Sequence, residues 1–141
     1  MSDDKYLVRI EASVRIDIDL YRGGNGSSAR LDNVRDRDIV KFKDQESGLT
    51  KVKGMSGGIS TFTDPKPEAN WWCIKAGTPV PPKLVITRDT TDPKTMITHY
   101  TIRPEADMLL TEFIAQLQSF VGVEKLPIER AIALGGRWET R

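Results

Sequence analysis

The chain contains 141 residues, with 21 Lys and Arg, 20 Asp and Glu, and a formal net charge of +1. Its 38% apolar and 29% charged residues are typical of a globular protein and argue against a disordered chain or a coiled coil. The balanced charge offers no phosphate-neutralising surface of the kind that sequence-independent nucleic-acid binding requires. Nucleic acid is therefore expected only as the substrate of a reaction.

One cysteine, Cys73, and one histidine, His99, restrict the available metal and redox chemistry. They form neither an internal disulfide nor a zinc tetrad, so we expect no metal site and a reducing compartment. Residues 1–5 are polar and acidic, and no unbroken apolar run reaches the length of a signal peptide or a membrane span. We therefore expect a soluble protein with no Sec signal peptide and no membrane partner.

Apolar residues occupy the even positions from Val8 to Leu20, and mostly polar or charged residues occupy the odd ones. This period of two predicts β-structure with one buried face. The run is longer than a usual strand, which indicates either one strand bent near residues 12–13 or two strands that share a phase. The strand is expected to end at Arg22, before a mobile loop at residues 23–28 that is rich in Gly and Ser.

The middle of the chain is predicted to be mostly sheet. The adjacent Trp71 and Trp72 are expected to place one indole on each face of that sheet. The polar residues 87–94 are interpreted as a loop. Strand candidates lie at residues 38–43, 49–53, 59–62, 71–74, 84–86 and 95–102.

The periodicity changes at Pro104, which suits a first helical turn with Glu105 and Asp107 near its N-terminus. By the same interpretation, Arg103 belongs to a helix start and not to an acid–base pair. An apolar stripe at three-to-four spacing then predicts an amphipathic helix. The stripe contains Leu109, Leu110, Phe113, Ile114, Leu117, Phe120 and Val121.

A second, shorter helix is expected at residues 127–134, ended by Gly135 and Gly136. The charged residues 137–141 would then be exposed or docked. No repeat or linker divides the chain, so residues 1–141 are expected to form a single domain. Its predicted class is α+β, with a late helix packed on a β-rich core.

Arg22 is the most informative position, because it continues the even parity of the buried face. A guanidinium there needs an anion or several acceptors. One interpretation is structural: the strand has already frayed or bulged by Arg22, or the side chain pairs with an internal carboxylate. The other is that Arg22 binds a ligand phosphate or ribose beside the glycine loop.

His99 has an ordinary pKa near neutrality and lies in a β-like run with Tyr100 on the opposite face. A lone strand histidine is more often structural than catalytic. Ser60 and Thr61 follow a Gly-Gly pair, which permits close approach of a ligand or of another backbone. The sequence contains neither the glycine-rich phosphate loop nor the Gly-x-Ser-x-Gly nucleophile elbow, which excludes those enzyme classes.

Four segments in order along the chain resemble a known toxin family: Leu20-Tyr21-Arg22, residues 57–62, residues 77–84 and residues 98–104. The family is that of the ADP-ribosyltransferase-like cytoplasmic toxins first described as type VI secretion effectors, with related toxins of toxin–antitoxin pairs. The similarity covers roughly residues 20 to 108, and its last two segments are the most specific. It implies a compact, β-rich ADP-ribosyltransferase-like sheet that binds NAD.

The resemblance implies that Arg22, Ser60 and His99 line one cleft as catalytic residues. It implies cofactor-binding roles for residues beside them, namely Tyr21, Arg22, Thr61, Phe62 and Tyr100. The family position before Ser60 is usually Thr and here is Ile59, so a hydroxyl role is lost at that position. The well-known transferases of the Arg-Ser-Glu class use a Glu that has no matching motif here, and Glu105 is the nearest candidate.

The resemblance further implies an NAD-dependent toxin that arrests growth in a bacterial cytoplasm and is neutralised by a cognate immunity protein or antitoxin. In that chemistry Arg22 would clamp phosphate or ribose, Ser60 would orient the ribose, and His99 would bind the ribose or move a proton. Hydrolysis of NAD, with water as the acceptor, is also compatible with this resemblance. The alternative is a non-catalytic toxin that inhibits its target by surface contact. The ADP-ribose acceptor would be an intracellular protein or a nucleic acid.

Overall fold

The computed structural model describes residues 9, 10 and 15–140 of the chain. Their main feature is a seven-stranded sheet with the order β1-β7-β8-β5-β2-β6-β10, in which every neighbouring pair is antiparallel. Its strands are β1 (Arg9–Ile10), β2 (Leu20–Gly23), β5 (Ile59–Phe62), β6 (Trp71–Ile74), β7 (Leu84–Thr91), β8 (Thr98–Pro104) and β10 (Val123–Lys125).

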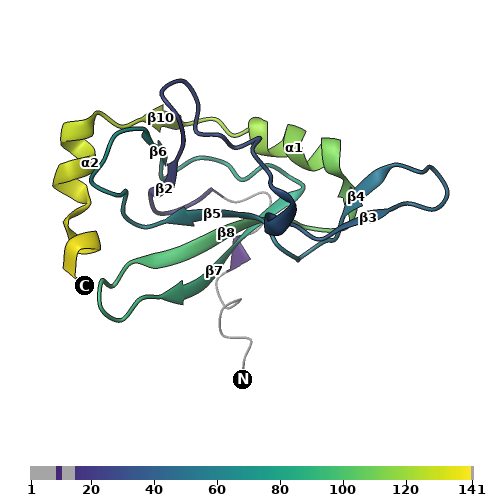
Figure 1. The fold of residues 1–141 in the computed structure, drawn as a ribbon, viewed down its shortest axis with the longest axis horizontal. Helices are drawn as coiled ribbons and strands as arrows, with labels where there is room; N and C mark the ends of the chain where they lie inside the picture. The colour runs from purple at the N-terminus through teal and green to yellow at the C-terminus, as the bar shows by residue number, and fades with distance from the viewer. Residues whose placement is uncertain (1–8, 11–14, 141) are drawn as a thin grey trace.

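A smaller sheet and two α-helices complete the α+β fold (Figure 1). The smaller sheet has three strands in the order β3-β4-β9, and its β3–β4 hairpin projects beyond the main sheet. These strands are β3 (Lys41–Lys43), β4 (Thr50–Val52) and β9 (Met108–Leu109). The helices are α1 (Leu110–Gln118) and α2 (Ile128–Leu134), with short 3₁₀ turns η2 (Asp36–Asp38) and η3 (Gly136–Thr140).

The two faces of the main sheet contribute to two separate apolar clusters. One face packs Leu20, Ile59 and Ile102 against Phe113 and Leu117 of α1, all of them at most 2% exposed. The opposite face carries a smaller cluster built on Tyr21, Trp71 and Cys73, with Phe62, Leu126 and Leu134 packed against it. Trp71 belongs to the smaller cluster and Trp72 packs against the larger one, which confirms the prediction of one indole on each face.

The long N-terminal alternation forms two separate strands and not one bent strand. β1 pairs with β7, whereas β2 lies between β5 and β6. Residues 16–19 belong to no strand, although Ile16 is only 1% exposed. Among the even positions whose burial the structure describes, Ile16 and Leu20 are buried and Ile18 is half-buried, so the period of two predicted burial there and strand pairing only in part. Val8, Ala12 and Val14 lie outside the described residues.

The helix predicted to start at Pro104 begins six residues later. Pro104 is the last residue of β8, and Glu105 continues the antiparallel contact by donating its backbone N–H to the carbonyl of Lys83. α1 starts only at Leu110 and buries Phe113 and Leu117. Propensity alone missed this because pairing with β7 holds residues 98–104 in extended conformation.

The C-terminal region follows the prediction and adds a strand. α2 begins after Pro127, which serves as its N-cap, and ends at Gly135. β10, which was not predicted, pairs with β6 before that helix. The charged tail is docked, because Arg137 forms an ion pair with Asp64.

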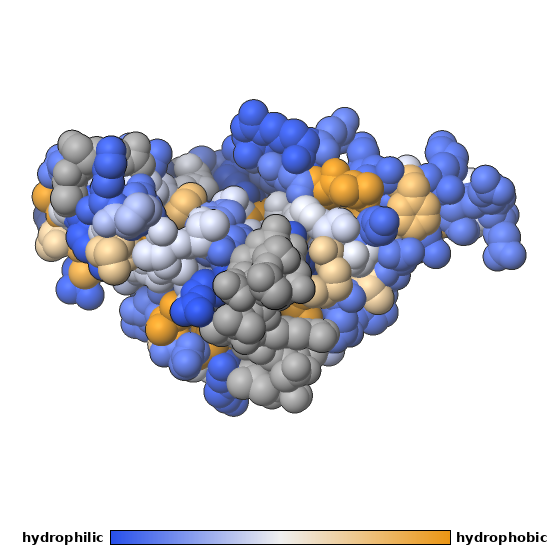
Figure 2. Space-filling model, turned by 90° about the horizontal axis from the view of Figure 1, so that it is seen from below, coloured by the Kyte–Doolittle hydropathy of each residue, from blue (hydrophilic) through white to orange (hydrophobic). Residues whose placement is uncertain are grey.

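The described surface is mainly hydrophilic, with small separate apolar patches on the face shown in Figure 2. The exposed large apolar side chains come from several elements: Val40, Phe42, Leu49, Met55, Met96, Val121, Ile128 and Ile132. Among the described helices, none has the length and apolar character needed to cross a membrane.

Candidate functional site

Arg22 ties together backbone segments on the α1 side of the sheet. β2 and β5 are paired only at Tyr21 and Phe62, so the two strands separate beyond that point. The Arg22 guanidinium reaches across and donates to the carbonyls of Ala29 (3.2 Å), Ser60 (3.0 Å) and Arg30 (3.2 Å). Burial lowers the pKa of Arg22, an effect that the charge of Asp38 opposes. The several acceptors that a guanidinium needs are backbone carbonyls here, and Arg22 remains paired with Trp72 within β2.

Replacing Arg22 with alanine is expected to lower the free energy of unfolding by about 1–3 kcal/mol, because three backbone carbonyls lose a charged donor. Urea denaturation followed by circular dichroism measures the change. Arg37→Ala, at an exposed position in η2, is the matched control with an expected change within about 0.5 kcal/mol. Equal stability of the two variants would contradict the bracing role of Arg22.

Ser60, Phe62 and His99 lie on the other face of the sheet. The register pairs Phe62 with His99 and Ser60 with Thr101, and cross-strand partners share a face. Arg22 shares the opposite face with its partner Trp72. The structure therefore brings Ser60 and His99 to one side of the sheet and leaves the side chain of Arg22 on the other.

The predicted cofactor-binding residues divide in the same way. Thr61 and Tyr100 are buried on the Arg22 face, where the Thr61 hydroxyl donates to the Tyr100 carbonyl at 3.1 Å. Tyr21 lies on the His99 face, and burial raises its pKa to about 12. Burial also raises the pKa of its neighbour Cys73 to about 12, which keeps that thiol protonated. Phe62 packs against the imidazole of His99, with 5.2 Å between the ring centroids.

His99 is held by a largely buried carboxylate, that of Asp89. The distance from His99 Nδ1 to Asp89 Oδ2 is 2.9 Å, and the Asp89 side chain is 10% exposed. The ladder between β7 and β8 shifts its register between Arg88 and Thr90, so Asp89 occupies a β-bulge. Bulges redirect side chains and are frequent beside active sites. Here the bulge brings the carboxylate to the imidazole.

Asp89 is itself fixed by three further side chains on the same face. Arg103 Nη2 lies 3.1 Å from Asp89 Oδ1, and the hydroxyls of Thr87 and Thr101 both donate to the carboxylate. Arg103 also donates through Nε to the Thr87 hydroxyl at 2.8 Å and through Nη1 to the Gly57 carbonyl at 2.7 Å. The carboxylate therefore has little freedom to move away from His99.

This network sets the tautomer of His99. A carboxylate only accepts hydrogen bonds, so Nδ1 carries the proton that it donates to Asp89. Burial lowers the pKa of His99, and the positive charge of Arg103 lowers it further, while Asp89 opposes both effects. The imidazole is therefore neutral at pH 7, and its Nε2 has a lone pair able to accept a hydrogen bond or a proton.

A cavity of about 200 Å³ lies beside His99. Its aromatic walls are Phe62 and Trp138, whose ring centroids lie 5.3 Å apart with planes inclined at 75°. The β7–β8 hairpin supplies the remaining lining residues, Thr90, Asp92, Thr95 and Ile97. An imidazole at an aromatic cavity can orient and deprotonate a ligand group there, so we take this cavity as the candidate active site.

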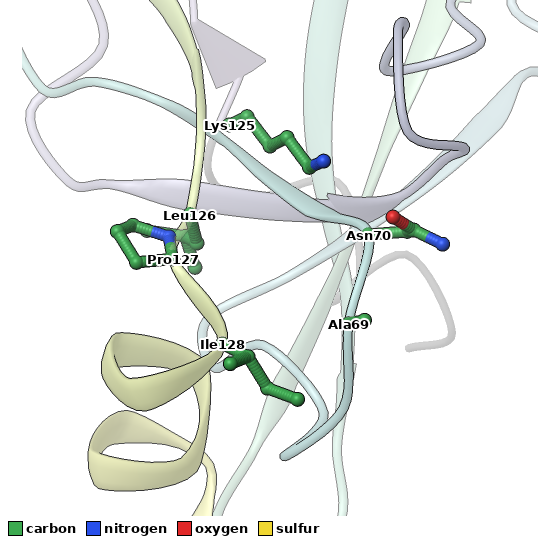
Figure 3. Close-up of a pocket in the computed structure, with 6 residues that line it drawn as sticks. All are labelled: Ala69, Asn70, Lys125, Leu126, Pro127 and Ile128. Atoms are coloured by element: carbon green, nitrogen blue, oxygen red, sulfur yellow. The ribbon is translucent and has the colours of Figure 1, made fainter.

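Two larger cavities are not lined by an imidazole. The cavity in Figure 3, of about 440 Å³, is lined by Ala69, Asn70, Leu126, Pro127, Ile128 and Lys125. Lys125 is its charged residue, and that ammonium donates to the Gly26 carbonyl at 3.1 Å. A cavity of about 310 Å³ lies on the Arg22 face beside Trp72 and Phe120. Neither is lined by His99, so we assign the chemistry to the smaller one.

Glu105, the predicted substitute for a catalytic glutamate, lies at a different place. It lines a cavity with Lys83 and Glu112 that does not include His99. The carboxylate beside His99 is Asp89, which the sequence analysis missed because it assigned residues 87–94 to a loop. Within the described residues, no cluster of His, Cys, Asp and Glu has the composition of a metal site.

Comparisons with known proteins agree with the resemblance seen in the sequence. Curated proteins give no match to the chain. A family model described as Tse2 ADP-ribosyltransferase toxin matches residues 5–125. This range includes every strand of both sheets, α1, and the pair Asp89 and His99. The chain therefore belongs to the Tse2 ADP-ribosyltransferase toxin family.

Proposed function

We propose that this toxin transfers ADP-ribose from NAD to an intracellular acceptor at the His99 cavity. The observation that carries the proposal is an imidazole oriented by a largely buried carboxylate at an aromatic cavity, in a member of an ADP-ribosyltransferase toxin family. NAD supplies a reactive glycosidic bond: nicotinamide leaves with the bonding electron pair, C1′ of the ribose bonds to the acceptor, and the acceptor loses a proton. The residues of the chain bind and orient NAD, and one of them accepts that proton.

The residues present fit one end of this substrate. Ligand pockets for drug-sized molecules are about 300–1,000 Å³, so a cavity of about 200 Å³ accommodates one ring and leaves the rest of the dinucleotide outside. Phe62 and Trp138 provide apolar walls for a planar heteroaromatic ring. The ammonium of Lys66 lies 5.3 Å from the centre of the Trp138 ring, within the range of a cation–π contact.

His99 has the leading role in the proposal. Its Nε2 accepts a hydrogen bond from a ribose hydroxyl or takes the proton of the acceptor, as a general base does. The catalytic role of Ser60 stays a prediction, and its exposed position on the same face is compatible with ribose binding. The catalytic role of Arg22 also stays a prediction, and its guanidinium donates to three backbone carbonyls.

The biological setting follows from the same proposal. The toxin acts in a bacterial cytoplasm and arrests growth by modifying a protein or a nucleic acid. A cognate immunity protein or antitoxin protects the cell that makes it. These statements go beyond the family assignment, which identifies the protein as an ADP-ribosyltransferase toxin and names neither its target nor its setting.

Two differently labelled forms of NAD test the reaction. The protein is incubated with bacterial lysate and NAD labelled either in adenine or in nicotinamide. Adenine label is expected in macromolecules, and nicotinamide label is expected as free nicotinamide. Separate protease and nuclease digestion then identifies the acceptor class. Heat-denatured protein is the control for carry-over of label.

Each outcome has a defined meaning. Release of nicotinamide without macromolecular label would replace transfer by NAD hydrolysis. Neither release nor label, with growth arrest intact in cells, would refute the proposal and favour a toxin that acts by surface contact. Macromolecular label that carries nicotinamide would also refute it, because the glycosidic bond would then be intact.

A further inference from the structure

The C-terminal segment outside the family-matched residues is anchored beside the His99 cavity. Arg137 holds both oxygens of Asp64, with Nε–Oδ2 and Nη2–Oδ1 distances of 2.7 and 2.5 Å. It also donates to the Met96 carbonyl at 3.3 Å, in the turn of the β7–β8 hairpin. Figure 1 shows the end of the chain close to the turn of that hairpin. A bidentate pair with a carboxylate that is 10% exposed gives this segment a defined position.

This anchor sets the orientation of the next residue, Trp138. Its Nε1 donates to the Asp64 carbonyl at 3.1 Å, so both Arg137 and Trp138 bind the same residue. The indole stands edge-on to Phe62 and lines the cavity with His99. Asp64 lies two residues after Phe62, the last residue of β5, which couples the two aromatic walls through a short stretch of chain.

We infer that Trp138 is a substrate-contacting residue that binds the planar heteroaromatic ring of a nucleotide, and that Arg137 is the positioning residue that holds it. This inference rests on the proposed function and extends the active site beyond residues 5–125, where the family match ends. Trp138 and Phe62 present apolar ring surfaces at one cavity, and His99 supplies the adjacent polar atom. The shared ligand chemistry is that of nicotinamide and adenine.

Steady-state kinetics of NAD consumption test the contact. Trp138→Ala is expected to raise KM for NAD about tenfold, the effect of losing one good aromatic contact, with kcat changed less than about threefold. Trp138→Phe should retain most of the affinity because it keeps a ring at the wall. Glu139→Ala, an exposed neighbour in η3, is the matched control and should leave KM unchanged. Equal KM in wild type and Trp138→Ala would overturn the inference.

Arg137 has a separate prediction within the same experiment. Arg137→Ala should raise KM less than Trp138→Ala does, and the double variant should be no worse than Trp138→Ala alone. Additive effects would mean that Arg137 does not act through Trp138. Unfolding free energies of all the variants separate loss of substrate contact from loss of fold, and Trp138→Phe keeps the test available if the alanine variant is unstable.

Binding of nucleotide fragments keeps this test distinct from that of the reaction. Nicotinamide mononucleotide and adenosine monophosphate are titrated into wild type and Trp138→Ala by calorimetry. Weaker binding of either probe to the variant supports the contact and identifies its ring. Unchanged binding of both probes overturns it, even if wild type transfers ADP-ribose. If the variant binds a probe more weakly but the wild type transfers no ADP-ribose, the proposed function is refuted. The inference that Trp138 binds a heteroaromatic ring is still supported in that case.

Discussion

Asp89→Asn is expected to lower the rate of ADP-ribosyl transfer by about a hundredfold to ten thousandfold. Asparagine has nearly the same shape as aspartate, but its amide nitrogen can donate toward His99 Nδ1. The imidazole would then carry its proton on Nε2, and that nitrogen would lose the lone pair that accepts a hydrogen bond or a proton. Initial rates with labelled NAD measure the loss.

The pH dependence of the same variant separates positioning from folding. Asp89 raises the pKa of His99 against the larger effect of burial, so its removal lowers that pKa further. Activity that needs neutral His99 falls as pH drops through this pKa, so the acid limb of the profile should move to lower pH. An acid limb that stays in place while the rate falls equally at every pH would point to loss of folded protein.

A double variant provides the second control for Asp89. If Asp89 acts through His99, Asp89→Asn combined with His99→Ala should be no slower than His99→Ala alone. Multiplying losses would show that Asp89 has an independent role. Thr98→Ala, on the same strand but outside the cavity lining, controls for general effects of substitution in β8.

Gly58→Ala is expected to lower the free energy of unfolding by about 3–5 kcal/mol. Gly58 has φ of +132°, where side chains are strained, and a Cβ there would lie 2.3 Å from the Ile102 carbonyl oxygen. The backbone of β8 would have to move, and β8 is the strand that carries His99 and Arg103. Chemical denaturation measures the loss, and transfer activity should fall with it.

Gly77→Ala is the matched control for Gly58→Ala. Gly77 has φ of +92°, but a Cβ there would meet no atom within 4 Å. This variant carries the backbone strain alone, about 1–3 kcal/mol. Equal losses at the two glycines would mean that the close approach of Gly58 to β8 contributes nothing to stability.

The strands predicted best are those whose residue types and borders agree. β5 and β6 match their predicted ranges, because turn-forming segments flank short runs of residues that favour strands. β7 was predicted to end at residue 86 and extends to Thr91, since pairing with β8 stabilises a polar segment that has no alternation. When polar residues of a paired strand show no alternation with apolar ones, the sequence alone predicts a loop.

Wrong assignments of secondary structure also concealed two residues of the site, Asp89 and Arg103. His99 and Phe62 were found through motif and composition, but Asp89 was placed in a loop and Arg103 at a helix start. Their association depends on a β-bulge and on contacts between strands, which residue spacing along one chain does not encode. Arg22 was expected to point to the buried face, and it does, but parity along one strand does not show that His99 faces the other way.

The anchoring of Trp138 also orders events during synthesis. Phe62, His99 and the hairpin residues of the cavity leave the ribosome before Trp138, which is the last lining residue to be translated. A chain can form the sheet and still lack one aromatic wall until η3 docks on Asp64. The cavity is thereby expected to be completed after the sheet, in a separate and later step of folding.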